Sequence, residues 1–132
     1  MAVRIVQLGS DRHPDEGLRL GVVRRPPRGV KKESWARDDW FDQWFPDLAP
    51  SAELVRWYHE EHPISDARWK KYVPRYRREM NTPERQRLIE LLARLSHHAD
   101  FSVGCYCEDG TRCHRSLLQE MLRQHGAQIA EP

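Results

Sequence analysis

All three cysteines of this 132-residue chain lie in one short stretch, residues 101–118, beside carboxylates, an imidazole and two guanidinium groups. A thiolate can act as a nucleophile, an imidazole can carry a proton, and a guanidinium can bind an anion. The candidate catalytic residues are Cys113, His114 and Cys107. The candidate binding residues are Arg115, Arg112, Glu108 and Asp109, which Arg28 and Arg24 can join from an upstream basic loop.

The elements around this stretch predict a ligand site. Residues 101–107 have the pattern of a buried strand, and residues 112–125 have the pattern of an amphipathic helix. In a parallel α/β sheet, the loop after a strand borders the usual ligand crevice, and the N–H groups of the next helix favour anions. We therefore expect a small anionic or nucleotide-type ligand. The alternative is that Arg112 and Arg115 are surface charges that close the loop over Glu108 and Asp109.

Two residues of this stretch have alternative interpretations. Cys113 would lie in the first helical turn, where the helix dipole and nearby arginines favour a thiolate, so the protein is a candidate thiol-dependent enzyme. It also precedes Leu117 by four residues, so it can instead face the core as a small apolar side chain. His114 is expected to lean toward the sheet, where it either moves a proton or makes fixed hydrogen bonds that hold a loop.

A metal site is the less favoured interpretation of the same residues. The set Cys105, Cys107, Cys113 and His114 could supply zinc ligands, but its C-x-C-x5-C-H spacing lacks the paired C-x2-C of common zinc sites. We therefore expect no cofactor. A phosphatase-type loop, in which an arginine follows the cysteine after five residues, is excluded because Cys113 occupies that position after Cys107.

The rest of the chain predicts a single α/β domain over residues 1–132, with a small, mostly parallel sheet and helices packed around it. Strands are expected at residues 3–8, 18–23 and, at the end, 127–130. Helices are expected to start after Ser51, Ser65 and Thr82, and Pro74 should kink or shorten the second of them. Gly126 should close the last helix in a left-handed conformation. The aromatic block at residues 35–46 has mixed spacing and predicts no particular element.

Composition excludes some classes of function. The chain has no apolar run of about 18 residues, so no membrane span is expected. The first residues run directly into a predicted strand and do not resemble a signal peptide, and an odd number of cysteines is a poor disulfide framework. These features indicate a cytoplasmic protein. They do not indicate an oligomeric state.

Two further functions compete with the ligand site. The basic loop of residues 24–32, together with residues 72–78, could contact nucleic acid, although a net charge of +2 does not by itself imply that partner. A protein-interaction role is the other alternative, and its sign would be Trp35 or Trp40 exposed in an apolar patch.

Several segments together resemble the domain of unknown function 488 family, which includes the YeaO-like proteins, over almost the whole chain. The resemblance lies in the Pro27-Arg28-Gly29 turn, the segment Trp44-Phe45-Pro46-Asp47-Leu48-Ala49-Pro50-Ser51, the helical pattern of Leu54, Trp57, Trp69 and Tyr76, and Cys105 with Cys113-His114-Arg115. The resemblance implies a small α/β fold and no agreed activity. The family pattern D-R-L-W-P-R-G is altered here, because Val23 replaces the Asp and Pro26 replaces the Trp.

Overall fold

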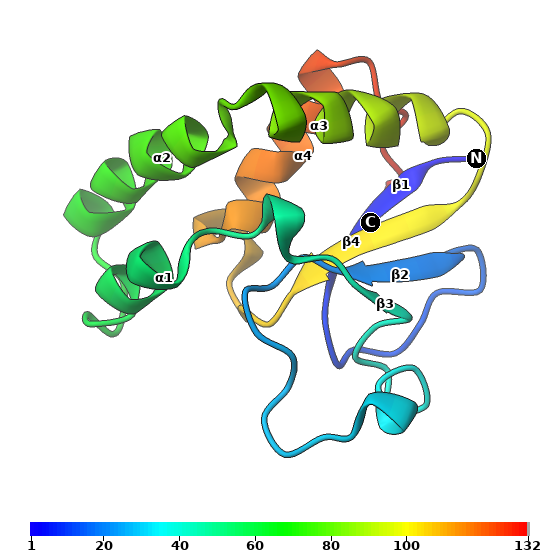
Figure 1. The fold of residues 1–132 in the computed structure, drawn as a ribbon, viewed down its shortest axis with the longest axis horizontal. Helices are drawn as coiled ribbons and strands as arrows, with labels where there is room; N and C mark the ends of the chain where they lie inside the picture. The colour runs from blue at the N-terminus through cyan, green and yellow to red at the C-terminus, as the bar shows by residue number, and fades with distance from the viewer. Residues whose placement is uncertain (132) are drawn as a thin grey trace.

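A computed structural model describes residues 1–131, and it contains one four-stranded sheet in which every strand pair is parallel. The strands are β1 (Val3–Gln7), β2 (Leu18–Gly21), β3 (Gln43–Trp44) and β4 (Phe101–Cys105), and their order across the sheet is β1-β4-β2-β3. The predicted α/β class is confirmed. Strand β4 comes last in the sequence but lies between β1 and β2, so its carboxyl end is flanked by theirs (Figure 1).

The helices begin where the sequence predicts caps. The elements are α1 (Ala52–Tyr58), α2 (Asp66–Met80), α3 (Pro83–Leu95) and α4 (His114–Gln124). Ser51, Ser65 and Thr82 each accept a hydrogen bond from a backbone N–H in the first turn of the helix that follows. Of the two effects predicted for Pro74, a kink or a shortened helix, the shortening is wrong, because α2 continues for six residues beyond it, to Met80. The expected left-handed Gly126 is confirmed by its φ of 86°.

Helices α2, α3 and α4 gather on one side of the sheet, and the loop that carries the short 3-10 turn η1 (Lys32–Ser34) extends away from them (Figure 1). The main core forms between these helices and the strands, and fully buried Tyr76, Ile89 and Leu118 belong to it. A second, smaller core lies at the carboxyl ends of the strands, where Phe41 packs with Leu8 and Val23. This second core also contains two of the three cysteines.

A buried ion pair ties the loops of the second core together. The side chains of Glu16 and Arg19 are 1% and 0% exposed, and two parallel hydrogen bonds of 2.9 and 3.0 Å join them. Arg19 Nη1 also donates to the carbonyls of Ser10 and Asp39. The pair therefore links the loop after β1 to the loop before β3. Because Arg19 binds the carbonyl of Asp39, it also fixes the position of the adjacent Trp40.

Three predicted boundaries at the end of the chain are wrong. Strand β4 stops at Cys105 instead of residue 107, and the last helix begins at His114 instead of residue 112. Residues Gly110–Arg112 form a separate 3-10 turn, η3, and Cys113 follows it with φ −132° and ψ 152°, an extended conformation that keeps the turn and the helix apart. Residues 127–130 make one parallel bridge, between Ile129 and Val3, and no regular strand.

Within residues 1–131, no helix is both long enough and apolar enough to span a membrane.

Candidate thiol site

A cavity of about 900 Å³ lies at the carboxyl ends of β1, β2 and β4. Strand ends supply Gln7, Leu8 and the segment 105–107, the basic loop supplies residues 23–28, and α1 supplies one wall. Parallel strands place all their carboxyl ends at one edge, so three segments distant in sequence meet there. The predicted location of the site, at the end of β4, coincides with this cavity.

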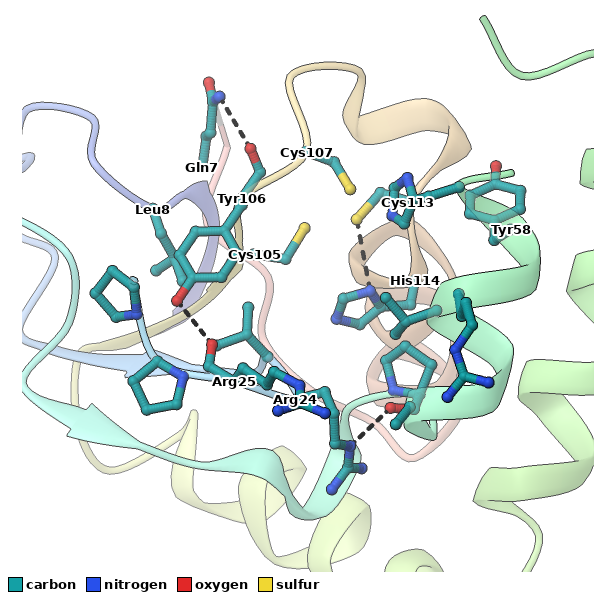
Figure 2. Close-up of a pocket in the computed structure, with 18 of the residues that line it drawn as sticks. Gln7, Leu8, Arg24, Arg25, Tyr58, Cys105, Tyr106, Cys107, Cys113 and His114 are labelled. Carbon is teal, nitrogen blue, oxygen red and sulfur yellow. Dashed lines mark hydrogen bonds between the residues drawn. The ribbon is translucent and has the colours of Figure 1, made fainter. Parts of the chain in front are cut away.

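The three cysteines converge inside the cavity. Their sulfur atoms point toward one another, and His114 lies beneath Cys113 (Figure 2). Hydrogen bonding to both other thiols lowers the pKa of Cys107. Cys105 and Cys113 are buried, whereas Cys107 is half-buried and all three line the cavity. Cys107 is therefore the thiol best placed to meet a ligand.

The shared hydrogen bonds set the ionisation of the cluster. Hydrogen bonds from Cys105 and Cys113 lower the pKa of Cys107, because two S–H donors stabilise its thiolate. The hydrogen bond to Cys107 raises the pKa of Cys105, and burial raises the pKa of Cys113. The thiolate form is thus favoured at Cys107 and disfavoured at Cys105 and Cys113. Cys113 occupies the N-cap position of α4, but its side chain makes no capping hydrogen bond and is 1% exposed, which fits the alternative in which it faces the core.

A backbone carbonyl directly after strand β2 holds His114 in place. Its Nε2 lies 2.6 Å from the carbonyl oxygen of Val22, so Nε2 carries the proton and donates it to that oxygen. Its Nδ1 then has a free lone pair, which faces the Sγ of Cys113 at 3.6 Å. Burial lowers the pKa of His114, so the imidazole is neutral near pH 7. The expected lean toward the sheet is confirmed. The single proton of the Cys113 thiol can be donated either to Nδ1 or to the Cys107 sulfur.

Basic side chains surround the opening. Arg24 lines the cavity, but its guanidinium donates to the carbonyls of Pro46, Ala49 and Pro50 and so also fastens the loop before α1. Exposed Arg25, Arg28 and Arg56 line the cavity as well. The candidate residues Arg24 and Arg28 are therefore at the site, where they give it a positive potential that suits an anionic ligand.

Aromatic side chains form the remaining walls. Tyr106 donates from its hydroxyl to the carbonyl of Arg25 at 2.9 Å, and its ring lies edge-on to Trp40 with centroids 5.9 Å apart. Tyr58 donates to the carbonyl of Arg112 at 2.7 Å, and burial raises its pKa, so this hydroxyl stays protonated. The walls thus offer flat apolar surfaces beside the positive charges.

Four of the candidate binding residues do not line this cavity. Arg112 points to α2, where it donates to the carbonyl of Ile64 and pairs with Asp66. Arg115 points toward the carboxyl ends of β1 and β4, where its Nη1 donates to the carbonyls of Val6 and Cys105. Glu108 and Asp109 are exposed, and Asp109 accepts hydrogen bonds from Thr111. The expected clamp of Arg112 and Arg115 on one anion is therefore not formed.

The altered family positions have structural roles here. Val23 is 4% exposed in the second core, and its carbonyl accepts a hydrogen bond from the indole of Trp44. Pro26 lines the cavity. An aspartate at position 23 would need a polar partner inside an apolar cluster, so the change to valine suits the packing seen here.

The metal interpretation has a geometric basis but no established cofactor. The ligand atoms of Cys105, Cys113 and His114 all lie within 4.8 Å of one another. Thiolates and a neutral imidazole fit a soft ion such as zinc. Burial among apolar side chains and protonation of Cys105 and Cys113 explain the same cluster without an ion.

The surfaces that the two alternative functions require are only partly present. Of the aromatic residues in 72–78, Tyr72 and Tyr76 are buried, so they offer no faces for stacking on bases. Arg25, Arg28, Lys31 and Lys32 are exposed and remain free to contact phosphates. Trp35 and Trp40 are half-buried against the second core and form no exposed apolar patch.

Sequence reasoning missed several cavity residues, namely Gln7, Trp40, Arg56, Tyr58 and His59. Gln7 could have been found, because it ends the first predicted strand and parallel strands share one edge. Residues of α1 could not, because nothing in the local sequence indicates that this short helix reaches the end of β4.

The fold and the site define a small α/β protein with a thiol cluster at the carboxyl edge of a parallel sheet. The chain belongs to the domain of unknown function 488 family: residues 3–126 match a family described as the active DUF488-N3 subclade. It is similar to the uncharacterised protein Mb3100c of Mycobacterium bovis and to Rv3073c of Mycobacterium tuberculosis, each 34% identical over 120 residues that cover 91% of this chain and 92% of the relative. No solved structure matches the chain significantly.

Proposed function

We propose that the protein is a thiol-dependent enzyme that acts on a small anionic molecule bound in the large cavity, with Cys107 as the nucleophile. The observation that carries this proposal is the position of Cys107: its half-buried sulfur lines a cavity beside two buried cysteines, and these neighbours lower its pKa. An accessible thiolate is the reactive form of cysteine. The word "active" in the description of the matching subclade agrees with an enzymatic role.

The cluster can support a displacement with a balanced proton. The Cys107 thiolate would form a bond to an electrophilic centre of the substrate as the bond to the leaving group breaks and carries away its electron pair. Cys113 would give its thiol proton to the leaving group. Water, or another small hydroxyl compound, would then displace the substrate from Cys107 and return a proton to Cys113. His114 Nδ1, 3.6 Å from Cys113 Sγ, would keep that thiol in position.

The cavity walls suggest the substrate class. Arg25, Arg28 and Arg56 at the opening favour an anionic group, whereas Trp40 and Tyr106 favour a flat apolar part. A nucleotide or a similar planar molecule with a phosphate or carboxylate combines both features. The free thiols also suit a reducing compartment, so a cytoplasmic location is part of the proposal.

The test is the alkylation rate of each cysteine against pH, followed by mass spectrometry of the modified peptides. We expect iodoacetamide to modify Cys107 first, at a rate that changes less than twofold between pH 6 and 8, whereas an ordinary thiol gains about tenfold per pH unit in this range. Hydrogen-bonded thiolates are weaker nucleophiles, so the flat profile, not the absolute rate, is diagnostic. Adenosine monophosphate should slow the reaction by occupying the cavity.

The matched variants are Cys113→Ala and Cys107→Ser. The first removes one donor, so the alkylation rate of Cys107 should become pH-dependent. The second should abolish the fast reaction. If all three thiols react only after unfolding, Cys107 is not an accessible thiolate and the proposal is wrong.

Nucleic-acid binding through the exposed residues Arg25, Arg28, Lys31 and Lys32 is the second candidate. It predicts binding to DNA or RNA at low salt that weakens steeply as salt is added. Absence of binding at low salt would remove it.

A further inference from the structure

A second cavity, of about 380 Å³, lies along the edge strand β1. Its walls come from the edge strand β1, the turn η3 and the first turns of α4. Three arginines, Arg4, Arg115 and Arg123, line it, and the only carboxylate among its described lining residues is that of Glu131. The cavity therefore has an excess of positive charge.

The most buried of these arginines is only partly satisfied. Arg115 is 8% exposed, and its Nη1 donates to the carbonyl of Val6 at 3.0 Å. Within residues 1–131, its Nε and Nη2 have no hydrogen-bond partner. A buried guanidinium normally has its N–H groups paired, because leaving them unpaired costs free energy. Two parallel N–H groups of one guanidinium are the arrangement that binds an oxyanion.

Gly110 packs closely against this pair of N–H groups. A Cβ added to Gly110 would lie 2.7 Å from Arg115 Nη2 and 2.9 Å from Nε, which is closer than a carbon atom packs against a nitrogen. Any other residue at position 110 would therefore force the Arg115 guanidinium to move.

A second guanidinium on the same cavity is also partly unpaired. Arg4 Nη1 donates to the carbonyl of Glu131 at 3.0 Å, while its buried Nε has no partner among residues 1–131. Arg123 forms an ion pair with Glu120 and so contributes less charge. Arg115 and Arg4 thus present unused N–H donors to one small, partly enclosed space.

We propose that the second cavity binds a phosphate-type oxyanion, held by the Nε and Nη2 of Arg115 and by the Nε of Arg4. The site is distinct from the thiol cavity, and Gln7 lines both. The ligand is either inorganic phosphate or the phosphate group of a small metabolite, since both present the same oxygens.

The test is an NMR titration that follows the Nε–Hε signals of the arginines. Inorganic phosphate is one probe and glycerol 3-phosphate is the other, each at constant ionic strength made up with chloride. We expect the signals of Arg115 and Arg4 to shift and to saturate, while the signal of exposed Arg87 stays in place. Tighter binding of glycerol 3-phosphate would identify a metabolite phosphate, and equal binding would identify the free anion.

Two variants locate the site. Gly110→Ala places a methyl group 2.7 Å from Arg115 Nη2, so the guanidinium must move and binding should weaken at least tenfold, with the backbone spectrum otherwise unchanged. Arg4→Gln should weaken binding about fivefold, and it tests the proposal even if the Gly110→Ala variant perturbs the fold. Arg87→Gln, on the surface of α3, is the control. Shifts that grow linearly and equally at all arginines, or wild-type binding by both variants, would overturn the proposal.

Discussion

Glu16→Gln should destabilise the protein strongly, because it leaves the fully buried Arg19 without a counter-charge. The amide can keep one of the two hydrogen bonds to Arg19, and Arg19 retains the carbonyls of Ser10 and Asp39. The loss should therefore lie near the lower end of the range for breaking a buried ion pair, about 3 kcal/mol. The free energy of unfolding of a small domain typically falls by about 2 kcal/mol per M of urea, so the urea concentration at the unfolding midpoint should fall by roughly 1.5 M.

The assay is urea unfolding followed by tryptophan fluorescence, with Glu90→Gln as the matched control. Glu90 pairs with Arg94 across one helical turn on the surface, and its removal should cost less than about 0.5 kcal/mol. Replacing both Glu16 and Arg19 by methionine should recover much of the loss, because no unpaired charge then stays buried. If Glu16→Gln costs no more than Glu90→Gln, the reasoning about this pair is wrong.

Two other predictions concern the core beside the thiol site. The pKa of His114 is lowered in the folded protein, so its neutral form stabilises the fold above the unfolded-state value of about 6.5, and this contribution is lost as the pH falls toward 5. Thermal unfolding from pH 7.5 to 5 should show this slope, and His114→Gln should reduce it. Tyr76→Phe removes the hydroxyl that donates to the buried carbonyl of Leu48 at 2.7 Å, so the free energy of unfolding should fall by about 1–3 kcal/mol. Urea unfolding measures this loss, and an unchanged midpoint would contradict the prediction.

Helical and strand periodicity predicted most of the fold. Apolar runs located β1 and β2, and the cap residues Ser51, Ser65 and Thr82 located the starts of three helices. Strand β3 could not be predicted, because two paired residues leave no periodic pattern. The buried Glu16–Arg19 pair was also missed, since a charged residue in an apolar run does not reveal its partner.

The order of strand, loop and helix predicted that the cysteine-bearing loop lies at the carboxyl edge of the sheet, but not how its side chains are arranged. Arg112 and Arg115 would face the same side if both belonged to one helix, because residues three apart are neighbours there. The extended conformation of Cys113 interrupts that geometry, so the two guanidinium groups serve different parts of the molecule. The accessibility of each thiol depends on how deeply its sulfur is buried, and the local sequence does not determine that burial.

The central position of β4 has a consequence for synthesis on the ribosome. Strand β1 pairs with a segment about one hundred residues later in the chain, and β2 finds its longer neighbour in the same late segment. The emerging polypeptide therefore cannot complete its sheet strand by strand, and closing so long a loop is slow. The early strands must wait, open to chaperones or to misassociation, until the cysteine-bearing segment leaves the exit tunnel and completes both the sheet and the thiol cluster in one step.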